Sequence, residues 1–73
     1  MSEYKIIYVK EFGNISLELN YYNEWYSCRL DNKVSHDYIE IFKIKDEHKA
    51  IYFYSKILNI YEELFSSEVK END

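Results

Sequence analysis

The spacing of the apolar residues changes once along the chain, near residue 46, and this change restricts the folds available to it. Before that point, apolar and polar residues alternate over short runs, which is the period of a half-buried strand. After it, apolar residues recur every three or four positions, which is the period of an amphipathic helix. A chain of 73 residues has room for one domain. The pattern therefore predicts an α+β domain in which a sheet precedes a single helix.

Four runs of β-forming residues separated by turn signals predict a four-stranded sheet. We expect these strands to form an antiparallel meander, with the helix packed on it. Turns are predicted at Phe12–Asn14, at Asn20–Asn23 and at Asp31–Lys33, where Gly, Asn and Asp gather. The predicted strands cover residues 4–11, 15–19, 25–30 and 38–44.

The first and last predicted strands are the ones whose faces are hardest to assign. Alternation places Tyr4, Ile6 and Tyr8 on one face and Ile7 and Val9 on the other. Because both faces are largely apolar, this strand is expected to be central in the sheet. In the run 38–44 both faces are again apolar, and the sequence leaves the buried face open.

The helix is predicted to begin after Asp46, which is a good N-cap, and Glu47 suits the positive end of the helix dipole. Its apolar stripe covers about half of the circumference, with Phe53 and Ile60 widening one edge. That width exceeds what one sheet face needs, so we expect a further contact with a curled sheet edge, a second protomer or a partner. Residues 1–67 are assigned to the domain and 68–73 to a disordered acidic tail.

No constellation in the sequence predicts chemistry. Ser35, His36 and Asp37 are consecutive, and consecutive residues of an extended chain point to opposite faces, so they cannot act as a triad. Cys28, His36 and His48 lack the paired spacing of zinc ligands. A single glycine excludes a glycine-rich phosphate loop. We therefore expect no enzyme and no catalytic, cofactor-binding or metal site.

The overall charge and the single cysteine bear on partners and location. A net charge of −5 disfavours direct contact with nucleic acid and anionic membranes, and is compatible with a basic protein surface. The same charge is also what solubility alone would require. One cysteine, no signal-peptide pattern and no long apolar run predict a cytoplasmic protein, in the host cell if the chain is phage-encoded.

The remaining functional signal is surface character. Nine tyrosines are more than the core of so small a domain can use, and Tyr and Trp dominate interface hot spots. The competing interpretation is that these rings only cap the edges of the core. If a partner is bound, the residues expected to contact it are Glu18, Tyr21, Tyr22, Glu24, Trp25, Tyr52, Glu62 and Glu63.

In size, charge and composition alone, the chain resembles the small acidic proteins, anti-CRISPR and anti-restriction proteins among them, that phages and mobile elements use against host nucleic-acid machines. This resemblance implies a non-enzymatic inhibitor or modulator that binds a basic, nucleic-acid-binding surface of a host protein. The alternative is a small structural or regulatory subunit that forms a homodimer through its helix. The dimer face would then comprise Ala50, Tyr54, Ile57, Tyr61 and Leu64.

Overall fold

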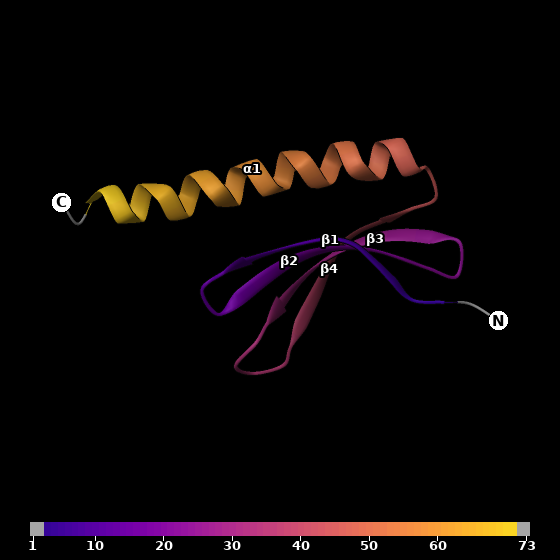
Figure 1. Ribbon diagram of the computed structural model, residues 1–73, viewed down its shortest axis with the longest axis horizontal. Coiled ribbons are helices and arrows are strands. Elements are labelled where there is room, and N and C mark those ends of the chain that lie inside the picture. The colour runs from indigo at the N-terminus through magenta and orange to yellow at the C-terminus, as the bar shows by residue number, and fades with distance from the viewer. Residues whose placement is uncertain (1–2, 72–73) are drawn as a thin grey trace.

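The computed structural model describes residues 3–71, and side chains as far as residue 66. It confirms the predicted fold, a four-stranded antiparallel meander in the order β1-β2-β3-β4 followed by one helix packed against it. Figure 1 shows the helix lying along one face of the sheet. The elements are β1 (Lys5–Phe12), β2 (Ile15–Tyr22), β3 (Trp25–Asn32), β4 (Tyr38–Ile44) and α1 (Glu47–Glu71).

The turn between β2 and β3 is tighter than the sequence predicted. It consists of Asn23 and Glu24, both with positive φ (53° and 72°), as the central residues of a type I′ hairpin turn require. The expected turn at Asn20–Asn23 is wrong, because β2 continues to Tyr22, which pairs with Trp25. Glu is an unusual residue at positive φ, so composition gave no signal for this turn.

A β-bulge in β1 reverses the facing of half that strand. Ile6 pairs with Asn20, whereas Tyr8 pairs with Leu19, so the register shifts at Ile7. Tyr8 therefore faces the helix, and the prediction that it shares a face with Tyr4 and Ile6 is wrong. β1 also lies at the edge of the sheet and not in its centre.

A second bulge, in β4, settles the facing that the sequence left open. Phe42 pairs with Cys28 and Glu40 pairs with Arg29, which leaves Ile41 as the extra residue. Phe42 packs against the core under the helix. Glu40 consequently faces the opposite side of the sheet.

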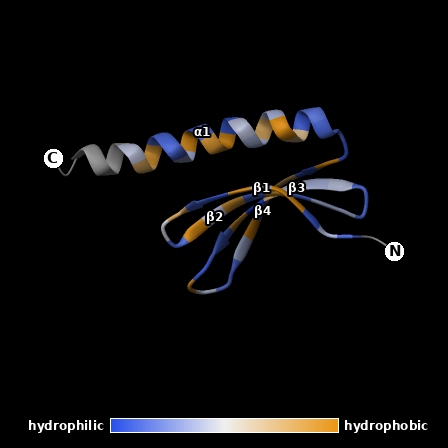
Figure 2. Ribbon diagram, viewed as in Figure 1, coloured by the Kyte–Doolittle hydropathy of each residue, from blue (hydrophilic) through white to orange (hydrophobic). Residues whose placement is uncertain are grey.

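The core lies between the helix and the sheet face turned towards it. Leu17, Leu19 and Cys28 are fully buried there, beneath Ala50 and Tyr54 of the helix. Figure 2 shows apolar segments recurring along α1 and along the strands beneath it. The Tyr54 hydroxyl donates a hydrogen bond to the Leu17 carbonyl oxygen at 2.8 Å. Burial raises the pKa of Tyr54 to about 12, so this donor stays protonated at neutral pH.

The start of the helix is as predicted. The Asp46 carboxylate accepts a hydrogen bond from the Lys49 backbone N–H at 3.0 Å, and this bond lowers the pKa of Asp46. Glu47 occupies the first turn. The helical backbone continues to Glu71, and residues 72–73 of the predicted tail lie outside the described residues.

Within residues 3–71, no helix is both long enough and apolar enough to cross a membrane.

Replacing Tyr54 by Phe removes the hydroxyl that bonds the Leu17 carbonyl and leaves the ring in place. We expect a loss of about 1 kcal/mol in the free energy of unfolding at pH 7, measured by urea denaturation. The exposed Tyr52 provides the control. Tyr52→Phe should change the free energy of unfolding by less than about 0.5 kcal/mol.

Tyr54→Phe should also change how the free energy of unfolding depends on pH in the alkaline range. Because folding raises the pKa of Tyr54 from 10 to about 12, the folded state holds its proton longer than the unfolded state. The contribution of this group is therefore complete below pH 10 and is lost as the pH rises towards 12. Stability should fall less steeply over this range in Tyr54→Phe than in the wild type. Equal slopes would contradict the role given to the buried phenol.

Candidate binding face on the uncovered side of the sheet

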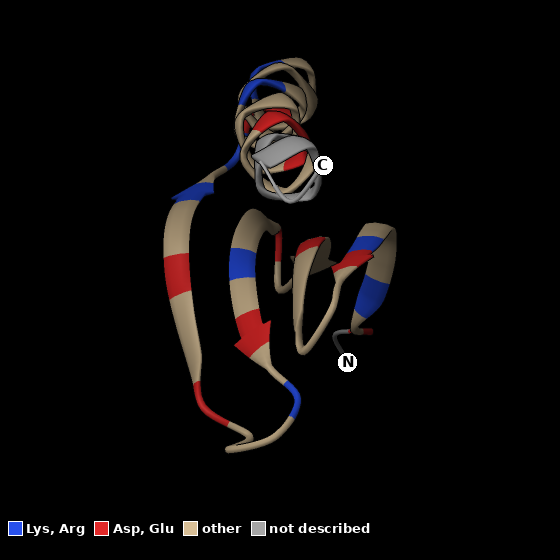
Figure 3. Ribbon diagram, turned by 90° about the vertical axis from the view of Figure 1, so that its left-hand side faces the viewer, with Lys and Arg blue, Asp and Glu red and all other residues tan. Residues whose placement is uncertain are grey.

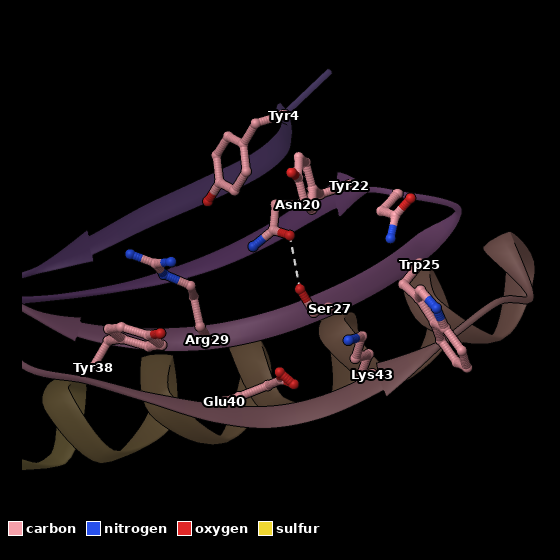
Figure 4. A pocket seen from close by; sticks show the side chains of 10 residues that line it. Tyr4, Asn20, Tyr22, Trp25, Ser27, Arg29, Tyr38, Glu40 and Lys43 are labelled. Carbon is pink, nitrogen blue, oxygen red and sulfur yellow. Dashed lines mark hydrogen bonds between the residues drawn. The ribbon is translucent and has the colours of Figure 1, made fainter. Parts of the chain in front are cut away.

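The helix covers one face of the sheet, and the other face, here called the open face, contains a hollow of about 220 Å³. β2, β3 and β4 contribute side chains to it, and so does Tyr4, which immediately precedes β1 (Figure 4). Aromatic side chains supply much of its wall, and polar side chains supply the rest. The lining residues are Tyr4, Asn20, Tyr22, Asn23, Trp25, Ser27, Arg29, Tyr38, Glu40 and Lys43.

The open face has a floor of buried polar side chains. Glu18 is only 7% exposed and Asn20 only 2%, although the helix does not cover either of them. Asn20 donates from Nδ2 to Glu18 Oε2 at 3.0 Å, and the Ser27 hydroxyl donates to Asn20 Oδ1 at 2.7 Å. Among the described residues, every buried side-chain nitrogen and oxygen has a partner. The floor is therefore a satisfied network with a fixed geometry.

Tyr4, which immediately precedes the edge strand β1, completes this network. Its hydroxyl donates to Glu18 Oε2. Burial, and then the bond to the Glu18 carboxylate, raise the pKa of Tyr4 to about 12. The phenol therefore remains a neutral donor, and the Glu18 carboxylate is occupied by two donors at once. Glu18 supports the face from below and does not project from it.

Arg29 is held in place from two sides. Its guanidinium donates to the Asp31 carboxylate over 3.0 to 3.3 Å, and this bond raises the pKa of Arg29. The same group lies 4.2 Å from the centroid of the Tyr38 ring. A guanidinium fixed by a forked carboxylate bond and an aromatic face presents a defined edge to a ligand.

The two aromatic residues beside the β2–β3 turn are accessible. Tyr22 is 50% exposed, and its ring centroid lies 6.3 Å from that of Tyr4. Trp25 is half-buried, with the Nζ atoms of Lys43 and Lys45 at 5.3 and 5.0 Å from its ring centroid. Tyr22 ends β2 and Trp25 begins β3, and the two residues pair across the tight turn. Both side chains therefore lie at the same end of the hollow.

Several residues predicted to contact a partner come together here. Tyr22 and Trp25 line the hollow, Glu18 is buried behind it and accepts a bond from the lining residue Asn20, and Glu24 is in the adjoining turn. Tyr21 lies on the opposite face of β2, with its ring 4.6 Å from that of Tyr26. The remaining three are exposed on the helix, away from the hollow: Tyr52, Glu62 and Glu63.

Of the lining residues, only Tyr22 and Trp25 were predicted from the sequence. Asn20, Ser27 and Arg29 could have been found, because strict alternation in β2 and β3 places them on the face of Glu18 and Tyr22. Tyr4, Tyr38 and Glu40 could not have been found by alternation. They reach the open face through strands whose register is shifted by bulges.

The predicted dimer face is partly occupied by the protein's own sheet. Ala50 and Tyr54 are buried there, and Ile57 and Tyr61 pack against the core. Of this set, only Leu64 is largely exposed. Any pairing of helices could therefore not use Ala50 and Tyr54, and would need other side chains in their place.

The residues considered for chemistry lie apart from the hollow. Cys28 is in the core, where burial raises its pKa to about 12, so the thiol is not ionised at neutral pH. His36 is in the β3–β4 connection with φ of 66°, and His48 is exposed in the first turn of α1. In the part of the chain that the structure describes, no three His, Cys, Asp or Glu side chains are grouped for a metal ion.

No protein-family model, no curated protein and no solved structure matches the chain.

Replacing Asn20 by Asp tests the hydrogen-bonded floor of the open face, because the two side chains have almost the same shape. The variant loses the Nδ2 donor and places a second carboxylate beside Glu18 in a buried position. We expect the free energy of unfolding to fall by about 2 to 3 kcal/mol at pH 7. Asn59→Asp, at an exposed helix position, should change it by less than about 0.5 kcal/mol.

The deficit of Asn20→Asp should depend on pH. The neighbouring carboxylate and the burial raise the pKa of the new carboxyl in the folded state, so the variant is penalised above the ordinary carboxyl pKa of about 4. The difference from the wild type should therefore shrink as the pH falls towards about 4. A deficit independent of pH would argue against the buried network.

Proposed function

We propose that this protein is a non-enzymatic binding module that docks another protein on the open face of its sheet. The observation that carries the proposal is the hollow that Tyr22 and Trp25 line together with Asn20, which is itself hydrogen-bonded to the buried Glu18. Rings of this kind, held on a rigid support, are the side chains that dominate interface energies. A fixed floor also lowers the entropy lost when a partner binds.

The net charge of the chain favours a partner with a basic surface. At the hollow itself the charges are mixed: Arg29 is compensated by Asp31, and the exposed Glu24, Glu40 and Lys43 form no ion pair among the described side chains. Figure 3 shows acidic and basic residues interspersed over the strands, so the face itself is not uniformly acidic. The net charge of −5 would instead accelerate the approach of a basic protein, and the aromatic hollow would fix its position.

A protein that covers a basic surface competes with the phosphates that bind there. The proposed activity is therefore inhibition or modulation of a nucleic-acid-binding protein, which is the mode of action of several of the anti-CRISPR-like proteins that the chain resembles in size and charge. Nucleic acid is a poorer candidate ligand for the open face, because the net charge of −5 opposes its phosphates, and so do the exposed Glu40 of the hollow and Glu24 of the adjoining turn.

Affinity capture with matched variants tests this function. A Tyr22→Ala, Trp25→Ala double variant should weaken binding of the captured protein at least about tenfold, because both rings leave the hollow. Tyr52→Ala removes a ring of similar exposure from the helix and should retain the partner. Dissociation constants can be measured by biolayer interferometry for the protein that distinguishes the two variants.

The salt dependence of binding tests the charge argument separately. Raising the ionic strength from about 0.05 to 0.5 M should reduce the association rate of a basic partner strongly. The proposal fails if no captured protein distinguishes the double variant from Tyr52→Ala. An affinity that does not change with salt would contradict a basic partner, but it would be compatible with docking on the open face.

A further inference from the structure

One edge of α1 carries apolar side chains that the sheet leaves exposed, together with Ile57, which the sheet covers in part. Phe53 is 46% exposed, Ile60 64% and Leu64 55%, and the half-buried Ile57 lies between them on the helix surface. Phe53 meets Phe42 edge-on, with ring centroids 6.2 Å apart, so this edge is the one on the side of β4. Phe53, Ile57, Ile60 and Leu64 are called the α1 strip below.

The residues of the α1 strip follow the spacing of a helix-pairing seam. From Phe53 the steps are four, three and four residues, which is the alternation of a heptad repeat. The opposite edge of the apolar arc, with Ile51 and Leu58, already packs against the core and offers no such seam. The apolar stripe of the helix, which is wider than one sheet face needs, thus has two parts. One part packs on the sheet, and the other is the α1 strip.

We propose that two copies of this chain form an antiparallel, two-fold dimer through the α1 strip. In that arrangement, Phe53 of one copy packs opposite Leu64 of the other, and Ile57 packs opposite Ile60. Both pairs are centred on the same point of the helix, between Leu58 and Asn59, so a single two-fold axis satisfies them together.

The charged residues beside the α1 strip select the antiparallel orientation. Lys56 and Glu63 flank the strip on its outer side, and neither forms an ion pair among the described side chains. Antiparallel pairing brings Lys56 of each copy to Glu63 of the other, which gives two opposite-charge contacts. Parallel pairing would instead place Lys56 beside Tyr61 of the second copy, and Tyr61 already packs against its own sheet.

The size of the domain supports the same inference. A chain of 73 residues with a single one-sided core is only marginally stable, and pairing is a common way for small domains to bury more apolar surface. The proposed dimer differs from the one expected from the sequence, since it replaces the covered Ala50, Tyr54 and Tyr61 by Phe53 and Ile60. It leaves the open face of both sheets accessible, because the helices lie on the opposite side.

Sedimentation equilibrium with charge-swapped variants tests the proposal. Lys56→Glu and Glu63→Lys should each raise the dimer dissociation constant at least about tenfold, because each creates two like-charge contacts. The double variant should return it to within about threefold of the wild type. A strictly monomeric wild type at about 100 µM, or a double variant no tighter than the single ones, would overturn the antiparallel pairing.

A second pair of variants separates the strip from general effects on folding. Ile60 is largely exposed in the single chain, so Ile60→Asp should leave the circular dichroism spectrum intact and abolish the dimer. Asn59→Asp, one residue away on the polar side, should leave both unchanged. A dimer that persists in Ile60→Asp would place the interface elsewhere.

Disulfide formation reports the orientation. In an equimolar mixture of Phe53→Cys and Leu64→Cys chains, the antiparallel dimer should give mainly the mixed disulfide, and each variant alone should give little. Efficient self-cross-linking of Phe53→Cys alone would indicate parallel helices and contradict the proposal. The native Cys28 is buried and should not interfere.

Discussion

The structure depends on the burial of one helix stripe against one face of the sheet. Ala50 and Tyr54 cover Leu17, Leu19 and Cys28, and the Tyr54 hydroxyl ties the helix to the β2 backbone. A single helix can cover only one face of a four-stranded sheet, so this core fixes which side chains are hidden and which are presented. The open face of the sheet and the α1 strip both exist because the helix packs on one side of the sheet only.

The open face of the sheet cannot rely on apolar packing, because nothing in the described chain covers it. Its inner positions are instead occupied by Glu18, Asn20 and Ser27, whose hydrogen bonds to one another and to Tyr4 leave no buried polar atom unpaired. A network of this kind holds the strands in register and supports exposed aromatic side chains at the same time. The proposed binding face is consequently built on the sheet itself.

The helix offers more apolar surface than the sheet can accept. The side chains that bind the sheet and those of the α1 strip are interleaved on the same turns, so one stripe serves two directions. Because the α1 strip and the open face lie on different sides of the molecule, self-association and partner binding would not compete. A two-fold dimer would present two open faces, and a partner with two sites would then bind more tightly through effective concentration.

The sequence alone determined the order of the elements, the alternation of β2 and β3 and the N-cap at Asp46, because these depend on local periodicity and on hydrogen bonds between near neighbours. It could not determine the facing of β1 and β4, since one bulge in each strand shifts the alternation by one residue without any glycine to mark it. Nor could it show that Arg29, Tyr38 and Tyr4 meet on one face. Those contacts join residues far apart in the chain, and only the pairing of all four strands brings them together.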